Sequence, residues 1–309
     1  MTNLEVQYVP STLEGKNIHT IIWDVESPRA VVQISHGMAE HIARYDEFAR
    51  FLNEQGIAVA GGSHLGHGLT AGDESELGFI APKKGWDHMV RDIHAVRQVV
   101  SAKYPGVPYI LLGHSMGSFL ARTYITQKYA AGLAGVIISG TANQPALIVG
   151  AGKMVDGLLK VFQGKRRRSG LLNAMSFGAY NKAFAPNRTE YDWLSRNDES
   201  VDRYVADPMC GFCFTTSAFG DLFDGLKYIG KKKNIKKADK SLPCLFIAGD
   251  KDPVGSNGKG VSDVADMFKS AGIKDVELHL YADARHEVLN EINREEVFAD
   301  VLSFINRII

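Results

Sequence analysis

The chain has 309 residues, 45% of them hydrophobic, and its 35 Lys and Arg balance its 35 Asp and Glu. This composition excludes an intrinsically disordered chain, and a net charge of zero gives no general attraction to nucleic acid. The length is enough for one large α/β domain that carries an inserted subdomain.

Two features bear on the compartment of the protein. The N-terminal stretch 1–7 lacks the basic and then apolar pattern of a secretory signal, and no stretch approaches the roughly 18 apolar residues of a spanning helix. Three cysteines are an odd number, which favours a reducing compartment over a disulfide framework. We therefore expect a cytoplasmic protein.

The N-terminal third predicts strands and two helices. Segments rich in β-branched and aromatic residues, separated by turn residues, predict strands at 4–9, 18–25, 30–35 and 57–60. Apolar residues at helical spacing predict a helix before the fourth strand and a longer one after it; they are Tyr45, Phe48 and Leu52, and then Met89, Ile93, Val96 and Val100.

Unbroken apolar runs mark the strands of the sheet centre. Residues 109–112, 136–138 and 245–248 have this pattern, which is typical of parallel strands buried on both faces. An alternating strand at 276–281 and a final helix with an apolar stripe from Val297 to Ile308 complete the chain. The alternation of strands and helices predicts an α/β fold with a mostly parallel, doubly wound sheet.

Residues 144–240 interrupt this alternation with a long block that has no strand-like runs. A block of this length between two predicted core strands favours a helical cap over a loop. We therefore expect a core formed by residues 1–143 and 241–309, with residues 144–240 inserted as a helical cap, or lid.

A nucleophile motif follows the strand at 109–112. Residues 113–117, Gly-His-Ser-Met-Gly, match G-x-S-x-G and precede a helix predicted at 119–129. The serine of this motif occupies a strained strand-to-helix turn, so the residues two before and two after it must lack a side chain. The helix N-terminus directs N–H groups at the reacting oxygen. Ser115 is therefore the predicted nucleophile.

A serine nucleophile needs a base and an acid. In proteins with this motif the chain order is serine, then the acid, then the histidine. His286 lies in a loop after the strand at 276–281, whereas His279 lies within that strand, so we expect His286 to be the base. Asp250 and Asp252 both follow the strand at 245–248. We favour Asp252 as the acid, with Asp250 as a turn-stabilising residue.

The tetrahedral intermediate of acyl transfer requires two backbone donors. One is expected to be the amide of Met116, which follows the nucleophile. The other is expected to be the amide of Met38, in the loop after the third strand.

Four motifs together resemble the monoacylglycerol lipases and bacterial lysophospholipase-like hydrolases of the α/β-hydrolase fold. They are H-G-x-x-E-H-x-x-R-Y at 36–45, G-H-G at 66–68, G-H-S-M-G at 113–117 and G-x-x-D at 249–252. The resemblance supports Asp252 as the acid and Met38 and Met116 as oxyanion donors. It also implies that Glu40 and Arg44 brace the oxyanion loop, and that single-chain acyl esters are hydrolysed without metal or cofactor.

One residue departs from the family pattern. The family usually has Asp three residues before G-H-G, where this chain has Ser63. That aspartate is structural in the family, so we expect its loss to bear on the order of this loop and not on the triad. The 144–240 block has little that can be matched to the family, so acyl length and head group cannot be carried over.

Apolar residues flank the basic run 165–168 in the block 144–240. They predict either a surface that contacts an anionic membrane or micelle transiently, or cap residues that pack on the core beside solvated charges. We favour the second slightly. In both cases apolar cap residues are expected to line the acyl site.

Other cysteine and histidine patterns predict no further chemistry. Cys210 and Cys213 form a C-x-x-C that we expect to pack within the cap. His41, His64 and His67 lack a carboxylate or cysteine at a known metal-ligand spacing, so we expect no metal.

The predicted function is hydrolysis of monoacylglycerol-type or lysophospholipid-type esters, with a small-molecule ester as the partner and no nucleic acid. The alternatives are an acyltransferase with the same triad and a general short-chain carboxylesterase. A lipid binder without catalysis is disfavoured, because Ser115, Asp252 and His286 are all present.

Overall fold

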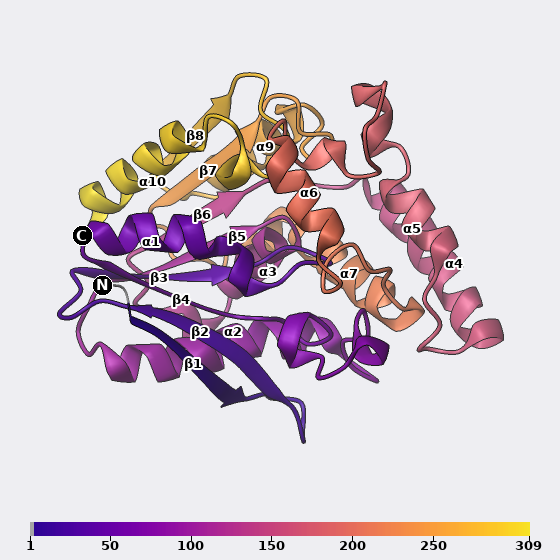
Figure 1. The fold of residues 1–309 in the computed structure, drawn as a ribbon, viewed down its shortest axis with the longest axis horizontal. Helices are drawn as coiled ribbons and strands as arrows, with labels where there is room; N and C mark the ends of the chain where they lie inside the picture. The colour runs from indigo at the N-terminus through magenta and orange to yellow at the C-terminus, as the bar shows by residue number, and fades with distance from the viewer. Residues whose placement is uncertain (1–2) are drawn as a thin grey trace.

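The computed structural model describes residues 3–309. At its centre is one eight-stranded sheet (Figure 1). Its strands lie in the order β1-β2-β4-β3-β5-β6-β7-β8. The first two strands pair antiparallel to their neighbours, and the others run parallel. The bounds are β1 (Asn3–Pro10), β2 (Asn17–Asp24), β3 (Ala30–Ser35), β4 (Ile57–Gly62), β5 (Tyr109–His114), β6 (Gly135–Ser139), β7 (Cys244–Gly249) and β8 (Val276–Tyr281).

The central strands are covered on both faces. Every residue of β3 to β7 is buried, as their unbroken apolar runs predict. Helices α1 (Asp46–Glu54) and α10 (Arg294–Ile308) cover one face. Helices α2 (Gly85–Lys103), α3 (Met116–Tyr124) and α9 (Lys259–Ser270) cover the other. The α/β-hydrolase fold with a mostly parallel sheet is confirmed.

Two helices differ from the sequence prediction. The helix predicted at 119–129 is α3, which begins at Met116 and ends at Tyr124, and residues 128–130 form a separate 3-10 turn. Apolar spacing marks the buried face of a helix and not its ends, so these bounds were wrong. Helix α9 was not predicted from the sequence, because its buried stripe is short; it consists of Val261, Val264, Ala265 and Phe268.

Residues 144–240 contain five helices and lie beside the carboxyl ends of the parallel strands, at the right of Figure 1. The helices are α4 (Ala146–Gln163), α5 (Gly170–Phe177), α6 (Asp198–Ala206), α7 (Thr216–Ile229) and α8 (Lys232–Ile235). Helix α7 packs on α2 and α3, whereas α4 and α5 form the outer edge. Within residues 3–309, no helix is both long and apolar enough to span a bilayer.

The outer helices α4 and α5 expose most of their apolar side chains. The expectation that the apolar residues beside the basic run pack on the core holds for Leu159, Leu172 and Phe177 and is wrong for the others. Phe162 is 82% exposed and Val161 is 79% exposed, while Leu172 is buried. The exposed set comprises Leu147, Ile148, Met154, Leu158, Val161, Phe162, Leu171 and Met175. Helical spacing predicts which residues share a face, but not whether another element covers that face.

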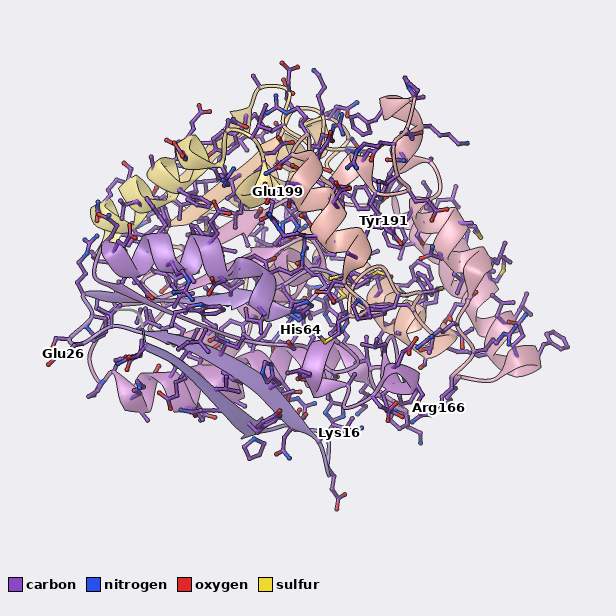
Figure 2. The ribbon with its side chains drawn as sticks, viewed as in Figure 1. Lys16, Glu26, His64, Arg166, Tyr191 and Glu199 are labelled. Carbon is purple, nitrogen blue, oxygen red and sulfur yellow. The ribbon has the colours of Figure 1, made fainter. Side chains whose placement is uncertain are left out.

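The basic run 165–168 contacts the core rather than being only solvated. Arg166 pairs with Glu76 at 2.7 Å, and its guanidinium carbon lies 3.8 Å from the ring centroid of Phe79. Arg168 donates to the carbonyl oxygen of Leu77 at 3.3 Å. Figure 2 shows Arg166 at the lower rim of the helical segment. These contacts tie the start of α5 to the loop that precedes α2.

We expect Phe246→Ala to lower the free energy of unfolding by about 3–5 kcal/mol, because it leaves a cavity in a tight core. Phe246 is fully buried in β7, and its ring meets that of Phe268 edge-on at 5.0 Å. Urea denaturation measures the loss. The control Phe162→Ala, at a side chain 82% exposed, should change stability by less than about 0.5 kcal/mol. Equal effects of the two variants would contradict this description of the core.

Candidate active site

Ser115 occupies a strained turn between β5 and α3. Its φ of 52° and ψ of −120° lie where residues with a side chain rarely occur. A Cβ at Gly117 would lie 1.9 Å from the carbonyl oxygen of Ser35, and one at Gly113 would lie 2.4 Å from that of Gly117. Ser115 N donates to the carbonyl oxygen of Ser139 at 2.9 Å, which fixes the turn against β6. The two glycines are therefore required by close backbone contact.

His286 and Asp252 form a buried pair at the ends of neighbouring parallel strands. His286 Nδ1 lies 3.0 Å from Asp252 Oδ2, and the two side chains are 2% and 0% exposed. The second carboxylate oxygen of Asp252 accepts from the amide of Val254 at 2.8 Å. Asp250 instead accepts from the amide of Asp283 at 2.8 Å, so it joins two loops and does not contact His286. His279 remains on β8, paired with Asp300 at 3.0 Å.

The charges around His286 favour its protonated form. Burial alone would lower the pKa of this imidazole, but the charge and hydrogen bond of Asp252 outweigh burial and raise it above 6.5. The neighbouring His114 differs: burial, assisted by His286, lowers its pKa to about 3, so this ring is neutral. The two ring centroids are 4.8 Å apart. Of these two imidazoles, that of His286 is therefore the one whose surroundings favour accepting a proton.

The loop after β3 passes directly over Ser115. A Cβ at Gly37 would lie 3.2 Å from the Cβ of Ser115. Ala39 has a φ of 55°, which turns the chain back after Met38. Met38 and Met116 line the same cavity as Ser115 and His286. The structure therefore brings both expected oxyanion residues to the nucleophile.

A buried charge network holds this loop, and it includes Glu287, which no sequence pattern indicated. Glu40 accepts from the amide of Gly37, and from Tyr45 Oη at 2.9 Å. Arg44 binds Glu40 at 2.7 Å and binds both carboxylate oxygens of Glu287 at 2.7 Å. Burial alone would raise the pKa of Glu287, but Arg44 lowers it to about 2. Because Glu287 follows His286, the network links the oxyanion loop to the loop of the base.

Residues from 144–240 approach the oxyanion loop closely. Tyr204 Oη donates to the carbonyl oxygen of Ala39 at 3.0 Å. His41 Nε2 lies 2.8 Å from Asp207 Oδ2, and Cys210 lies beside them, with the three ligand atoms within 4.8 Å of one another. Sequence spacing did not reveal this group, because Asp207 and Cys210 lie more than 160 residues from His41 in the chain. Since His41 and Asp207 already pair, we interpret the group as a contact between the helical segment and the core.

The loop at Ser63 is packed although the family's aspartate is absent. Ser63 N donates to the carbonyl oxygen of His19 at 2.9 Å, and its own carbonyl oxygen accepts from Thr70 Oγ1 at 2.7 Å. His64 and His67 are buried, His64 Nε2 lies 3.1 Å from the carbonyl oxygen of His36, and Figure 2 shows His64 near the centre of the molecule. The main chain of Ser63 is thus held on both sides, by β2 and by Thr70.

A cavity of about 660 Å³ opens over Ser115 and His286. Its volume lies in the range of small-molecule sites, about 300–1,000 Å³. The helical segment supplies most of its lining, including apolar residues of α4, α5 and α7 and the polar residues Asn181, Thr189 and Glu190. The arrangement can hold an acyl chain on apolar side chains while its carbonyl group lies at the serine.

Comparisons with known proteins agree with this geometry. A family model described as serine aminopeptidase, S33, matches residues 26–293. A monoacylglycerol lipase of Mycolicibacterium smegmatis is 29% identical over 94% of this chain and 93% of its own. A monoglyceride lipase of Rattus norvegicus is 28% identical, over 98% and 91%. Among solved structures, a carboxyl esterase from Bacillus coagulans in complex with glycerol has a TM-score of 0.91 and 31% identity, covering 100% of this chain and 99% of its own.

We expect the imidazole of His286 to titrate above pH 6.5, and Asp252→Asn to move this titration below 6.5, because burial then acts without the opposing charge. NMR of labelled histidines measures both values, with the signal assigned by its loss in His286→Gln. The matched control Asp250→Asn removes a carboxylate that does not contact His286, and it should leave the titration unchanged. A His286 titration that Asp252→Asn does not lower would contradict the pair.

Proposed function

The chain belongs to the serine aminopeptidase S33 family of α/β-hydrolases and is a carboxylic-ester hydrolase, and we propose that its substrates are single-chain acyl esters of the monoacylglycerol or lysophospholipid type. We further propose that Ser115 is the nucleophile, His286 the base and Asp252 the acid. The observation that carries this assignment is the buried His286–Asp252 pair, whose imidazole lines the same cavity as Ser115.

The proposed reaction uses these groups in two steps. His286 takes the proton of Ser115 as its oxygen attacks the ester carbonyl, and Asp252 orients the imidazole and stabilises its charged form. The amides of Met38 and Met116 stabilise the negative oxygen of the tetrahedral intermediate. His286 then protonates the leaving alcohol, and water hydrolyses the acyl-enzyme by the same route. Glu40 and Arg44 keep the Met38 loop in place during both steps.

The substrate class is supported by the cavity and by the relatives. An apolar lining suits one acyl chain, and the polar residues among it suit a hydroxylated head group. A monoacylglycerol lipase and a monoglyceride lipase each match more than 90% of both chains. A general short-chain carboxylesterase is the second candidate, because the carboxyl esterase of known structure has the same fold at 31% identity. Specificity constants for esters of graded acyl length distinguish the two.

We propose that residues 144–240 act as a cap domain on a core of residues 1–143 and 241–309. All eight strands belong to the two core segments, while the cap supplies most of the cavity lining. The exposed apolar face of α4 and α5 suits transient contact with a membrane or micelle. Ile148 and Met175 belong both to this face and to the cavity lining, so a lipid at this surface would lie beside the entrance.

We expect Ser115→Ala to lower turnover of a monoacylglycerol by about five to six orders of magnitude, because the acyl-enzyme can no longer form. Initial rates with purified protein measure this loss, and circular dichroism verifies the fold of the variant. An amino-acyl p-nitroanilide serves as a control substrate for peptidase activity. Turnover near the wild-type rate in Ser115→Ala would exclude this serine as the nucleophile.

We expect the double variant Val161→Ser, Phe162→Ser to bind anionic lipid vesicles about tenfold more weakly. The reason is that two apolar side chains are no longer transferred from water into the lipid on binding. Vesicle co-sedimentation measures binding, and hydrolysis of a water-soluble short-chain ester should stay unchanged. The matched control is Tyr8→Ser, since Tyr8 is 59% exposed on β1, away from the cap. Equal vesicle binding by all three proteins would reject contact through α4.

A further inference from the structure

A short segment of the cap, residues 192–196, is bound tightly to the loop that carries His286. Glu287 N donates to the carbonyl oxygen of Leu194 at 2.7 Å, and His286 N donates to that of Trp193 at 3.4 Å. Ser195 Oγ donates to the carbonyl oxygen of Asn290 at 3.1 Å. The cap and the base therefore share main-chain hydrogen bonds, although they are about ninety residues apart in the chain.

Glu291 lies at the centre of this contact. Its side chain is 0% exposed, and its two carboxylate oxygens accept from four donors. One oxygen accepts from the amides of Arg285, at 2.8 Å, and Arg196, at 3.0 Å. The other accepts from Arg196 Nε and from the amide of Ile292, both at 3.0 Å. A carboxylate fits this set of donors, whereas an amide would place an NH₂ group against two of them.

The donors of Glu291 connect the base to the cap. Arg285 is the residue before His286, and Arg196 belongs to the cap segment. A fully buried carboxylate needs a charged partner, and Arg196 supplies it, with its side chain 24% exposed. Arg196 also donates to Asn293 Oδ1 at 2.9 Å, which extends the contact to the start of α10. The carboxylate thus fixes the main chain directly before the imidazole.

The same cap segment covers the imidazole itself. The ring centroid of Trp193 lies 5.2 Å from that of His286, and Tyr180 packs on Trp193 at 5.1 Å. Arg285 donates to the carbonyl oxygen of Ser195 at 3.2 Å. On the opposite side, Glu287 is held by Arg44 of the core. The loop of the base is therefore held between a core arginine and a cap arginine, each through a buried glutamate.

We propose that Glu291 is a positioning residue for the reaction: by binding Arg196 of the cap and the amide of Arg285, it sets the orientation of His286 toward Ser115. This inference rests on the proposed role of His286 as the base. The seating of the cap segment 192–196 then controls the proton-transfer step. A displacement of about 1 Å in a catalytic group can cost about 100-fold in rate.

The test is Glu291→Gln, which keeps the size of the side chain and removes its charge. We expect kcat to fall about 10- to 100-fold while KM changes by less than about threefold, because substrate contacts are intact and the base is misaligned. The rate of labelling by a fluorophosphonate, which needs an activated serine but no acyl site, should fall in parallel. The final labelled fraction gives the amount of folded enzyme and normalises kcat.

Asp156→Asn is the matched control. Asp156 is also a buried carboxylate of the cap, 2% exposed and paired with Lys160 at 2.6 Å, but its partners lie on α4. This variant should lower thermal stability and leave kcat per labelled site unchanged. The comparison separates loss of a buried cap charge from loss of alignment at His286.

Arg196→Met tests the same contact from the side of the cap. It also replaces Glu291→Gln as the test if that variant does not fold. It should lower kcat about 5- to 30-fold, and in the double variant the two effects should be less than multiplicative because they break one contact. A kcat per labelled site within twofold of wild type in both single variants would overturn the inference. If Ser115→Ala is inactive in that case, the triad stands and only the role of Glu291 is lost. If Ser115→Ala is active, the proposed function fails first.

Discussion

The burial of one carboxylate beside one imidazole is the constraint on which the rest of this structure depends. Asp252 follows β7 and His286 follows β8, and because these neighbouring strands are parallel, their carboxyl ends meet at one edge of the sheet. A buried, unpaired carboxylate would be costly, so Asp252 requires the imidazole as a partner. That requirement gives His286 a raised pKa and one orientation.

Close backbone packing brings the serine to the same edge. Gly113 and Gly117 leave no room for a Cβ, so the turn at Ser115 sits against the end of β3 and the loop that follows it. The Glu40–Arg44–Glu287 network then joins this loop to that of His286. Each buried charge in the network has a partner, which satisfies the physical condition for keeping several ionised groups beneath one small cavity.

Local patterns in the sequence predicted those parts of the molecule that are determined by interactions between residues close together in the chain. Unbroken apolar runs located β5, β6 and β7, and the glycines around Ser115 predicted the strained turn that the structure has. Asp252 and His286 came from the order of strands and loops, and the family resemblance supported Asp252. The structure brings this pair together, with 3.0 Å between His286 Nδ1 and Asp252 Oδ2.

The parts that sequence reasoning missed depend on contacts between distant segments. The pairing of Glu287 with Arg44 spans more than two hundred residues, so no spacing rule reveals it, although its place beside His286 is a signal that could have been used. Trp193 and Glu291 carry no local signal. The outward face of α4 has the same helical spacing as a packed face, and only the fold shows that no described element covers it.

The most direct test of the central claim is the pH dependence of fluorophosphonate labelling, with the labelled peptide identified by mass spectrometry. The account predicts one adduct, on Ser115, formed at a rate that declines as pH falls through the raised pKa of His286. An adduct on another residue, or a rate that stays constant down to about pH 5, where even an unperturbed histidine is protonated, would contradict it.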